Sequence, residues 1–102
     1  MIHVLAIITT KPGQRDAVLK AFNASVPAVH AEKGCIEYGA ATDAEGLGSF
    51  QTKFGEDTFV VVEKWESVDA LKAHSAAPHM AAYAASVKEM LAGRVIHVLS
   101  PS

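Results

Sequence analysis

Hydrophobic residues recur along this chain with two different spacings, which separate the expected strands from the expected helices. Residues 2–10, 35–42, 58–66 and 94–100 are short runs rich in β-branched and apolar side chains, a composition typical of β-strands. A turn sequence, KPG at residues 11–13, follows the first run. The pattern therefore predicts four strands.

The segment after the first strand has helical periodicity. From Gln14 onward, apolar residues recur at intervals of three or four: Val18, Phe22, Val26 and Val29. This spacing predicts an amphipathic helix. We expect Pro27 to kink it near its end. The lysine and glycine at residues 33–34 are expected to end it.

Two further helices are expected between the third and fourth strands. Ser67 has the residue type of an N-cap, with Asp69 in the first turn, and so opens a helix over VDALKAH. Pro78 suits the first turn of the next helix. Apolar residues continue that helix at the same spacing: Met80, Tyr83, Ala84, Val87 and Leu91. Gly93 is expected to end it.

The stretch 43–57, between the second and third strands, is rich in glycine and polar residues but also contains Leu47, Phe50 and Phe54. This composition predicts a long hairpin connection. A short strand over residues 49–53 (SFQTK) is one option within it.

The resulting order, β-α-β-β-α-β, is that of the ferredoxin-like fold, an α+β architecture with an antiparallel sheet. Both faces of the sheet are apolar: in the third strand Phe59 and Val61 point to one face, whereas Val60 and Val62 point to the other. Helices on one side can cover only one face. A second copy packed sheet to sheet is the simplest cover for the other, so we expect a homodimer.

Length, charge and cysteine content narrow the class of protein. The 102 residues have the size of one domain, spanning residues 1–102. The formal net charge is -2 and no basic patch is present, which argues against nucleic acid or an anionic membrane as a partner. The apolar runs are too short to span a bilayer, and the first residues lack the features of a signal peptide. The single cysteine, Cys35, cannot form an intrachain disulfide, so we expect a cytoplasmic protein.

Several motifs, taken in order, resemble the antibiotic biosynthesis monooxygenase (ABM) family. They are KPG after the first strand, EKGCIEY after the first helix, VEKWES in the third strand and AHSAAPHM between the later helices. The resemblance extends over essentially the whole chain and implies a single ABM-like domain that forms a dimeric α+β barrel. Within the family, SFQ, WES, PHMAAY and the terminal LSP are most similar to the bacterial quinol monooxygenases, which implies oxidation of a quinol by dioxygen.

No part of the sequence suggests a bound cofactor or metal. The chain has no glycine-rich nucleotide motif, and its histidines and cysteine match no metal-ligand spacing. A quinol is electron-rich and, once deprotonated, can itself give an electron to dioxygen. A base and a dry aromatic pocket would therefore suffice. We expect a cofactor-independent, metal-free protein whose partners are a small aromatic or quinol substrate and dioxygen.

Three side chains are the candidates for proton transfer. His74 and His79 flank a helix break at residues 77–78 that lets both turn toward the sheet, and histidine is the natural base near neutral pH. Glu63 lies on an otherwise apolar strand face, where a carboxylate needs a partner, and could orient a histidine or the substrate. Structural alternatives are a helix cap for His74, a surface position for His79 and a strand-end salt bridge for Glu63.

Aromatic residues are the candidates for the wall of a substrate pocket. Trp65 shares its strand face with Glu63, and Tyr83 shares a helix face with other apolar residues. Phe50, in the long connection, could form a lid. The alternatives are core packing for Trp65 and Tyr83 and an ordinary loop anchor for Phe50. Two other functions stay open: an isomerase of the autoinducer-processing kind, and a non-enzymatic dimer that binds an aromatic or quinone-like ligand.

Overall fold

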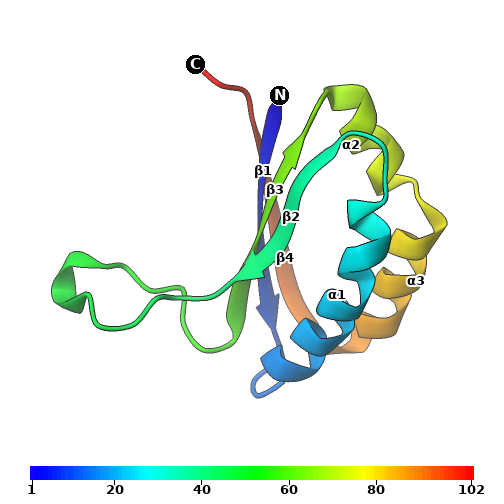
Figure 1. Cartoon of the computed structure of the whole chain (residues 1–102). Coiled ribbons are helices and arrows are strands. Elements are labelled where there is room, and N and C mark those ends of the chain that lie inside the picture. Colours follow the sequence, from blue (N-terminus) through cyan, green and yellow to red (C-terminus); the bar gives the residue numbers. More distant parts are fainter.

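The computed structural model describes residues 1–102 and has the predicted βαββαβ order (Figure 1). The strands are β1 (Ile2–Thr10), β2 (Cys35–Ala41), β3 (Thr58–Trp65) and β4 (Leu91–Leu99), and the helices are α1 (Arg15–His30), α2 (Val68–Ser75) and α3 (Pro78–Val87). Two short 3₁₀ helices, Gly48–Phe50 and Lys88–Met90, lie in the connections. The chain is an α+β, ferredoxin-like domain, as predicted.

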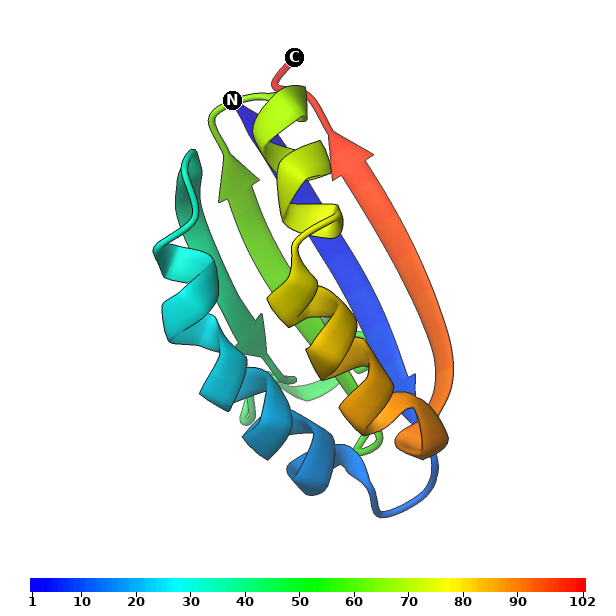
Figure 2. The same ribbon diagram turned by 90° about the vertical axis from the view of Figure 1, so that its right-hand side faces the viewer.

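The strands form one antiparallel sheet in the order β2-β3-β1-β4, and all the helices lie on one face of it (Figures 1 and 2). Along β1, Val4, Ala6 and Ile8 are buried beneath the helices. Leu5 and Ile7, between them, lie on the opposite face and are partly exposed. The sheet therefore has the two apolar faces that the alternation predicted, and the chain's helices cover only one of them.

An aromatic cluster fixes the helices on the sheet. Trp65, Phe22 and Phe59 are the largest fully buried side chains. The ring of Phe22, on α1, stacks on Tyr38 of β2 with centroids 5.2 Å apart, and meets Tyr83 of α3 edge-on at 6.0 Å. Such pairs add specific geometry to the burial of large apolar surfaces. They hold α1, α3 and β2 together around the site described below.

The predicted helix signals are confirmed where they depend on local chemistry. The Ser67 hydroxyl accepts a hydrogen bond from the Ala70 N–H at 3.1 Å and caps α2. Pro78 is the first residue of α3, and Pro27 lies inside α1 close to its end. None of the helices has both the length and the apolar character needed to cross a membrane.

The predicted end of the first helix is wrong. α1 stops at His30, a few residues after Pro27, which cannot donate a backbone hydrogen bond and so weakens the last turns. Gly34 instead serves the turn into β2, with a φ of +86°. A Cβ at Gly34 would lie 2.6 Å from the Cβ of Ala70. Glycine is therefore needed there for its backbone conformation and for the close approach of α2.

Two other predicted boundaries are also wrong. The last helix ends at Val87, and β4 begins at Leu91, so Gly93 is a strand residue and ends no helix. Pairing with β1 extends to the end of that strand, where Thr10 lies opposite Leu91, and this tertiary ladder overrides the local glycine signal. Residues 49–53 form no strand, because they lie in a projecting segment without a neighbour to pair with.

Residues 42–57, here called the arm, project from the sheet on the side opposite the helices (Figure 1). The Asp43 carboxylate accepts hydrogen bonds from two backbone N–H groups of the returning leg, at 3.0 and 2.8 Å. Lys53 forms a salt bridge with Glu45 at 2.7 Å. These contacts hold the two legs of the arm together without a β-ladder.

Candidate active site

A cavity of about 340 Å³ lies between the sheet and α3. Fourteen of its seventeen lining residues are hydrophobic, so it favours a largely apolar ligand. Ala6, Ile8 and Val61 line it from the sheet, and Tyr83 and Val87 line it from α3. A pocket of this size and lining suits a small aromatic ring system.

Glu63 is the buried carboxylate in the wall of this cavity. It lies on β3 two residues before Trp65, so both side chains point to the helix-covered face. The Trp65 indole Nε1–H donates a hydrogen bond of 2.9 Å to Glu63 Oε1. Burial raises the pKa of Glu63 above its ordinary value, and the Trp65 hydrogen bond and nearby His74 oppose the rise only in part. Glu63 is therefore poised to take a proton at a higher pH than an exposed glutamate.

His74, in the last turn of α2, lies behind Glu63. Its Nε2 is 4.0 Å from Glu63 Oε1, and its ring packs on Trp65 with centroids 4.5 Å apart. Its Nδ1 donates a hydrogen bond of 2.9 Å to the Glu32 carboxylate, since an ionised carboxylate can only accept. This bond leaves Nε2 on the side of Glu63, at a distance that allows an electrostatic interaction but is longer than a hydrogen bond.

His79, in the first turn of α3, bonds the same oxygen of Glu32. Its Nε2 also lies 2.9 Å from Glu32 Oε2. The four side chains form a series running outward from the cavity: Glu63 is 8% exposed, His74 6%, Glu32 14% and His79 35%. Such a series of titratable groups can carry a proton between a dry cavity and solvent.

The structure has no arrangement of side chains suited to a metal ion: no group of three or more His, Cys, Asp or Glu residues is placed so that it could hold one.

The sequence of the chain matches a known family. The family described as "Antibiotic biosynthesis monooxygenase" matches residues 1–86. The chain belongs to the antibiotic biosynthesis monooxygenase family. The match confirms the resemblance to the ABM family that the sequence motifs indicated.

Individual relatives agree with this assignment. A protein of Escherichia coli strain K12 named "Probable quinol monooxygenase YgiN" is 42% identical over 103 residues, covering 99% of this chain and 98% of that protein. The solved structure of Rv0793 from Mycobacterium tuberculosis superposes with a TM-score of 0.80 at 28% identity, covering 99% of this chain and 94% of the other. The structure of PA3566 from Pseudomonas aeruginosa, at 24% identity and a TM-score of 0.82, shares the fold. The family and the relatives support a monooxygenase-like function.

In this ABM domain, four of the six residues singled out from the sequence lie in one connected group. His74, Glu63 and Trp65 contact one another, and His79 joins them through Glu32. Trp65 is fully buried and backs Glu63, but it does not line the cavity. His74 lies in the last turn of α2, the position that the helix-cap alternative requires, and its two ring nitrogens also face carboxylates.

The other two predicted residues lie apart from each other. Tyr83 lines the cavity from α3, and burial raises the pKa of its hydroxyl. Phe50 lies in the arm, is 90% exposed and touches no part of the cavity of its own chain. The fold thus separates the expected lid residue from the site that it was expected to cover.

Sequence reasoning missed Glu32, the residue that joins the two histidines. It lies in the turn after α1, separated by 42 positions from His74 and by 47 from His79. One signal was available: a carboxylate just beyond a helix C-terminus is electrostatically unfavourable, so it calls for a local cationic or donor partner. Arg94, on β4 at the cavity wall, was also missed.

Proposed function

We propose that this ABM-family protein is a cofactor-independent monooxygenase that oxidises a small aromatic quinol with dioxygen. The observation that supports the proposal best is the buried Glu63 carboxylate in the wall of an apolar cavity, with His74 behind it. The two groups supply what a quinol lacks for reaction with dioxygen, namely a base in a site that excludes water. The name of the Escherichia coli relative points to the same substrate class.

In the first step, Glu63 accepts a proton from one quinol hydroxyl. Its raised pKa makes it a stronger base than an ordinary carboxylate. The apolar lining favours a planar ring, and the Tyr83 hydroxyl is available as a donor to the second quinol oxygen. The product of this step is a quinol monoanion, which is a far better electron donor than the neutral quinol.

In the second step, the monoanion transfers one electron to dioxygen, which gives a neutral semiquinone radical beside superoxide. The two radicals couple, so a C–O bond forms at the ring carbon next to the carbonyl. Glu63 returns its proton to the terminal peroxide oxygen. The base then removes the hydrogen on that carbon while the O–O bond breaks, and the departing hydroxide takes the proton and leaves as water. One oxygen atom stays on the ring, and enolisation gives a hydroxyquinone.

Each proton that Glu63 takes up is given back within the turnover, so the outward series from His74 through Glu32 to His79 serves to ionise Glu63 in the free enzyme by passing its proton to solvent. His74 is within 4.0 Å of Glu63, and Glu32 bonds both histidines. His79 is the member that solvent reaches most easily. In this proposal the histidines act through Glu63, which is the group that lines the cavity.

The test is anaerobic and aerobic incubation with a reduced naphthoquinol. We expect uptake of one dioxygen per hydroxyquinone formed, and labelled dioxygen should place one labelled atom in the product and one in water. Exchange of ring protons with no oxygen uptake would instead indicate an isomerase. Saturable binding without any turnover would indicate a protein that only binds quinone-like ligands. Either result would contradict the proposal.

We also propose that the functional unit is a homodimer joined through the open face of the sheet. The apolar side chains on this face include Val95 and Leu99 of β4, which are 54% and 46% exposed, and the partly exposed Leu5 and Val62. An apolar face of this extent favours association. Packing two such faces about 10 Å apart would bury them in a sandwich of two sheets.

A further inference from the structure

A surface groove between α3 and β4 adjoins the cavity. Ala84, Leu91 and Arg94 line both the cavity and this groove, which Lys88 and Ala85 extend over the surface. β4 is the edge strand that lies beyond the helices in Figure 2. The groove is therefore an apolar channel edged by two cations, and no segment of its own chain covers it.

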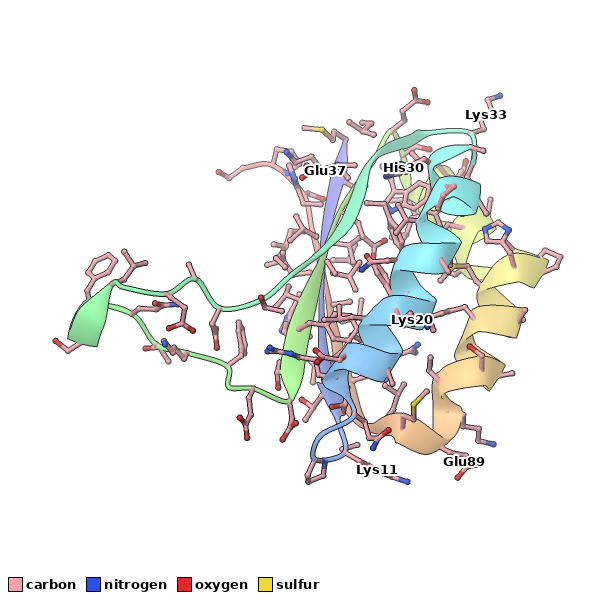
Figure 3. All side chains as sticks on the ribbon, turned by 60° about the horizontal axis from the view of Figure 1, so that its bottom comes forward. Lys11, Lys20, His30, Lys33, Glu37 and Glu89 are labelled. Atoms are coloured by element: carbon pink, nitrogen blue, oxygen red, sulfur yellow. The ribbon has the colours of Figure 1, made fainter.

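The arm has properties complementary to those of this groove. Leu47 and Phe50 are 51% and 90% exposed, although large apolar side chains are usually shielded from water. In Figure 3 the side chains of the outer part of the arm stand clear of the rest of the chain. The arm carries four acidic residues and one basic residue: Asp43, Glu45, Glu56, Asp57 and Lys53. The arm is thus an acidic segment that is held at its base, where the Gly13 N–H donates to Asp57, and that leaves the apolar side chains of its tip uncovered by its own chain.

The arm cannot reach the groove of its own chain. It leaves the sheet on the open face, whereas the groove lies among the helices on the other face (Figure 1). The arm is, however, long enough to reach the groove of a second copy of the chain. The leg over residues 42–49 can span roughly 26 Å when extended, and two packed sheets lie only about 10 Å apart. The arm of one copy can therefore pass beside the sheet of the other and reach its helix layer.

Strand register brings the arm and the groove to the same end of a dimer. The arm begins after Ala41 of β2 and ends at Thr58 of β3, and Thr58 lies opposite Thr9 of β1. The next residue, Thr10, lies opposite Leu91, where β4 and the groove begin. A two-fold axis parallel to the strands places edge strand β2 of one copy beside edge strand β4 of the other and keeps the ends aligned.

We infer that the arm of the partner copy lies in the groove between α3 and β4 and closes the cavity with Phe50, so that each site is completed by the other subunit. The inference rests on the homodimer in the proposed function. Exposed Phe50 and Leu47 would meet apolar Leu91 and Ala84, and the acidic arm would meet Lys88 and Arg94. Closure from the partner would also exclude water from Glu63, as oxygen chemistry on an anion requires.

Cross-linking between subunits tests this placement. All chains carry Cys35→Ala, which removes the one native thiol. A tagged chain with Phe50→Cys is coexpressed with an untagged chain carrying Ala85→Cys, and purified mixed dimers are treated with a short bismaleimide. We expect a covalent dimer joining residues 50 and 85 of different chains. The matched control pairs Phe50→Cys with Lys20→Cys, an exposed position on α1 away from the groove (Figure 3), and should remain uncross-linked.

A dimer by sedimentation whose residues 50 and 85 do not join would overturn the inference and leave the proposed oxygenase and dimer intact. A folded monomer would instead remove the dimer, and the inference with it. The second measurement is binding of 1,4-naphthoquinone, followed by quenching of the single tryptophan, Trp65. Phe50→Ser should weaken binding about tenfold, whereas Val68→Ser, an equally polar change on an exposed residue of α2, should not. Wild-type affinity in Phe50→Ser would show that the arm does not close the site.

Discussion

Replacing Glu63 by Gln should separate the chemistry of the site from its packing. Gln has nearly the same size, and its carbonyl oxygen can still accept the hydrogen bond from Trp65 Nε1. Only the basic carboxylate is lost. We therefore expect turnover of a naphthoquinol to fall by about 10²–10⁴, the effect of losing a general base, which corresponds to about 2.7–5.4 kcal/mol of activation free energy. The free energy of unfolding at neutral pH should fall by no more than about 1 kcal/mol, and a rise is also consistent.

The same variant predicts how stability depends on pH. Burial raises the pKa of Glu63 in the folded protein above its unfolded value. Between these two values the folded state holds more protons than the unfolded state, so its stability falls as pH rises. Glu63→Gln removes this contribution. Its free energy of unfolding relative to wild type should therefore increase as pH rises from about 4.5 through the raised pKa. Wild-type turnover should increase over the same interval, because the carboxylate must be ionised to accept a proton.

The assay is oxygen consumption at several pH values, together with chemical denaturation at the same values. The control is Glu37→Gln, which makes the same change on β2 at a glutamate that pairs with Lys64 at 3.0 Å and lies outside the cavity. Its turnover should equal that of wild type. If Glu63→Gln oxidised the quinol at the wild-type rate, Glu63 would not be the base, and the assignment of the cavity would be refuted. Equal loss in both variants would point to stability as the cause.

Three other changes test the surrounding network and the assembly. The double variant His74→Gln, His79→Gln should lower turnover by about 10²-fold or more with a much smaller loss of stability; a wild-type rate would show that the histidines have only structural roles. Glu32→Gln, which removes the carboxylate between them but does not touch the cavity, should lower turnover by about tenfold, and calorimetry should show a folded protein. Val62→Lys, at the middle of the open face, should destabilise the chain rather than give a well-folded monomer, because it places an unpaired charge in a buried interface. Sedimentation equilibrium showing a well-folded wild-type monomer at micromolar concentration would contradict the dimer, and a stable, folded monomer of Val62→Lys would show that the dimer is not obligate.

Strand and helix order could be predicted because each element carries its own period. The alternation along β1 and β3 also predicted correctly that the sheet has two apolar faces. The element ends were less predictable. Gly93 looks like a helix terminator in the sequence, yet pairing with β1 draws it into β4. Such a boundary depends on a strand that is remote in sequence, and no local pattern contains that information.

Some residues of the candidate site could likewise be placed from the sequence, and others could not. Glu63 and Trp65 could be placed on one face because they are two residues apart on a strand. Glu32 could not be placed, since its contacts with the histidines depend on how the turn after α1 packs against α2. Phe50 was expected in the wall of the pocket because a phenylalanine in a long connection resembles a lid. The direction in which the arm projects is fixed by the sheet, and it carries Phe50 away from its own cavity.

The helix break between α2 and α3 explains why two histidines five positions apart can act together. On a continuous helix they would point about 140° apart, on different faces. Ala77 instead has an extended backbone, with φ -66° and ψ 137°, and Pro78 starts a new helix. The change of direction brings Nδ1 of His74 and Nε2 of His79 to the same oxygen of Glu32, each at 2.9 Å. One of these histidines is buried beside Glu63 and the other is partly exposed. The helix break therefore lets a single carboxylate, Glu32, join a residue near the cavity to a residue near solvent.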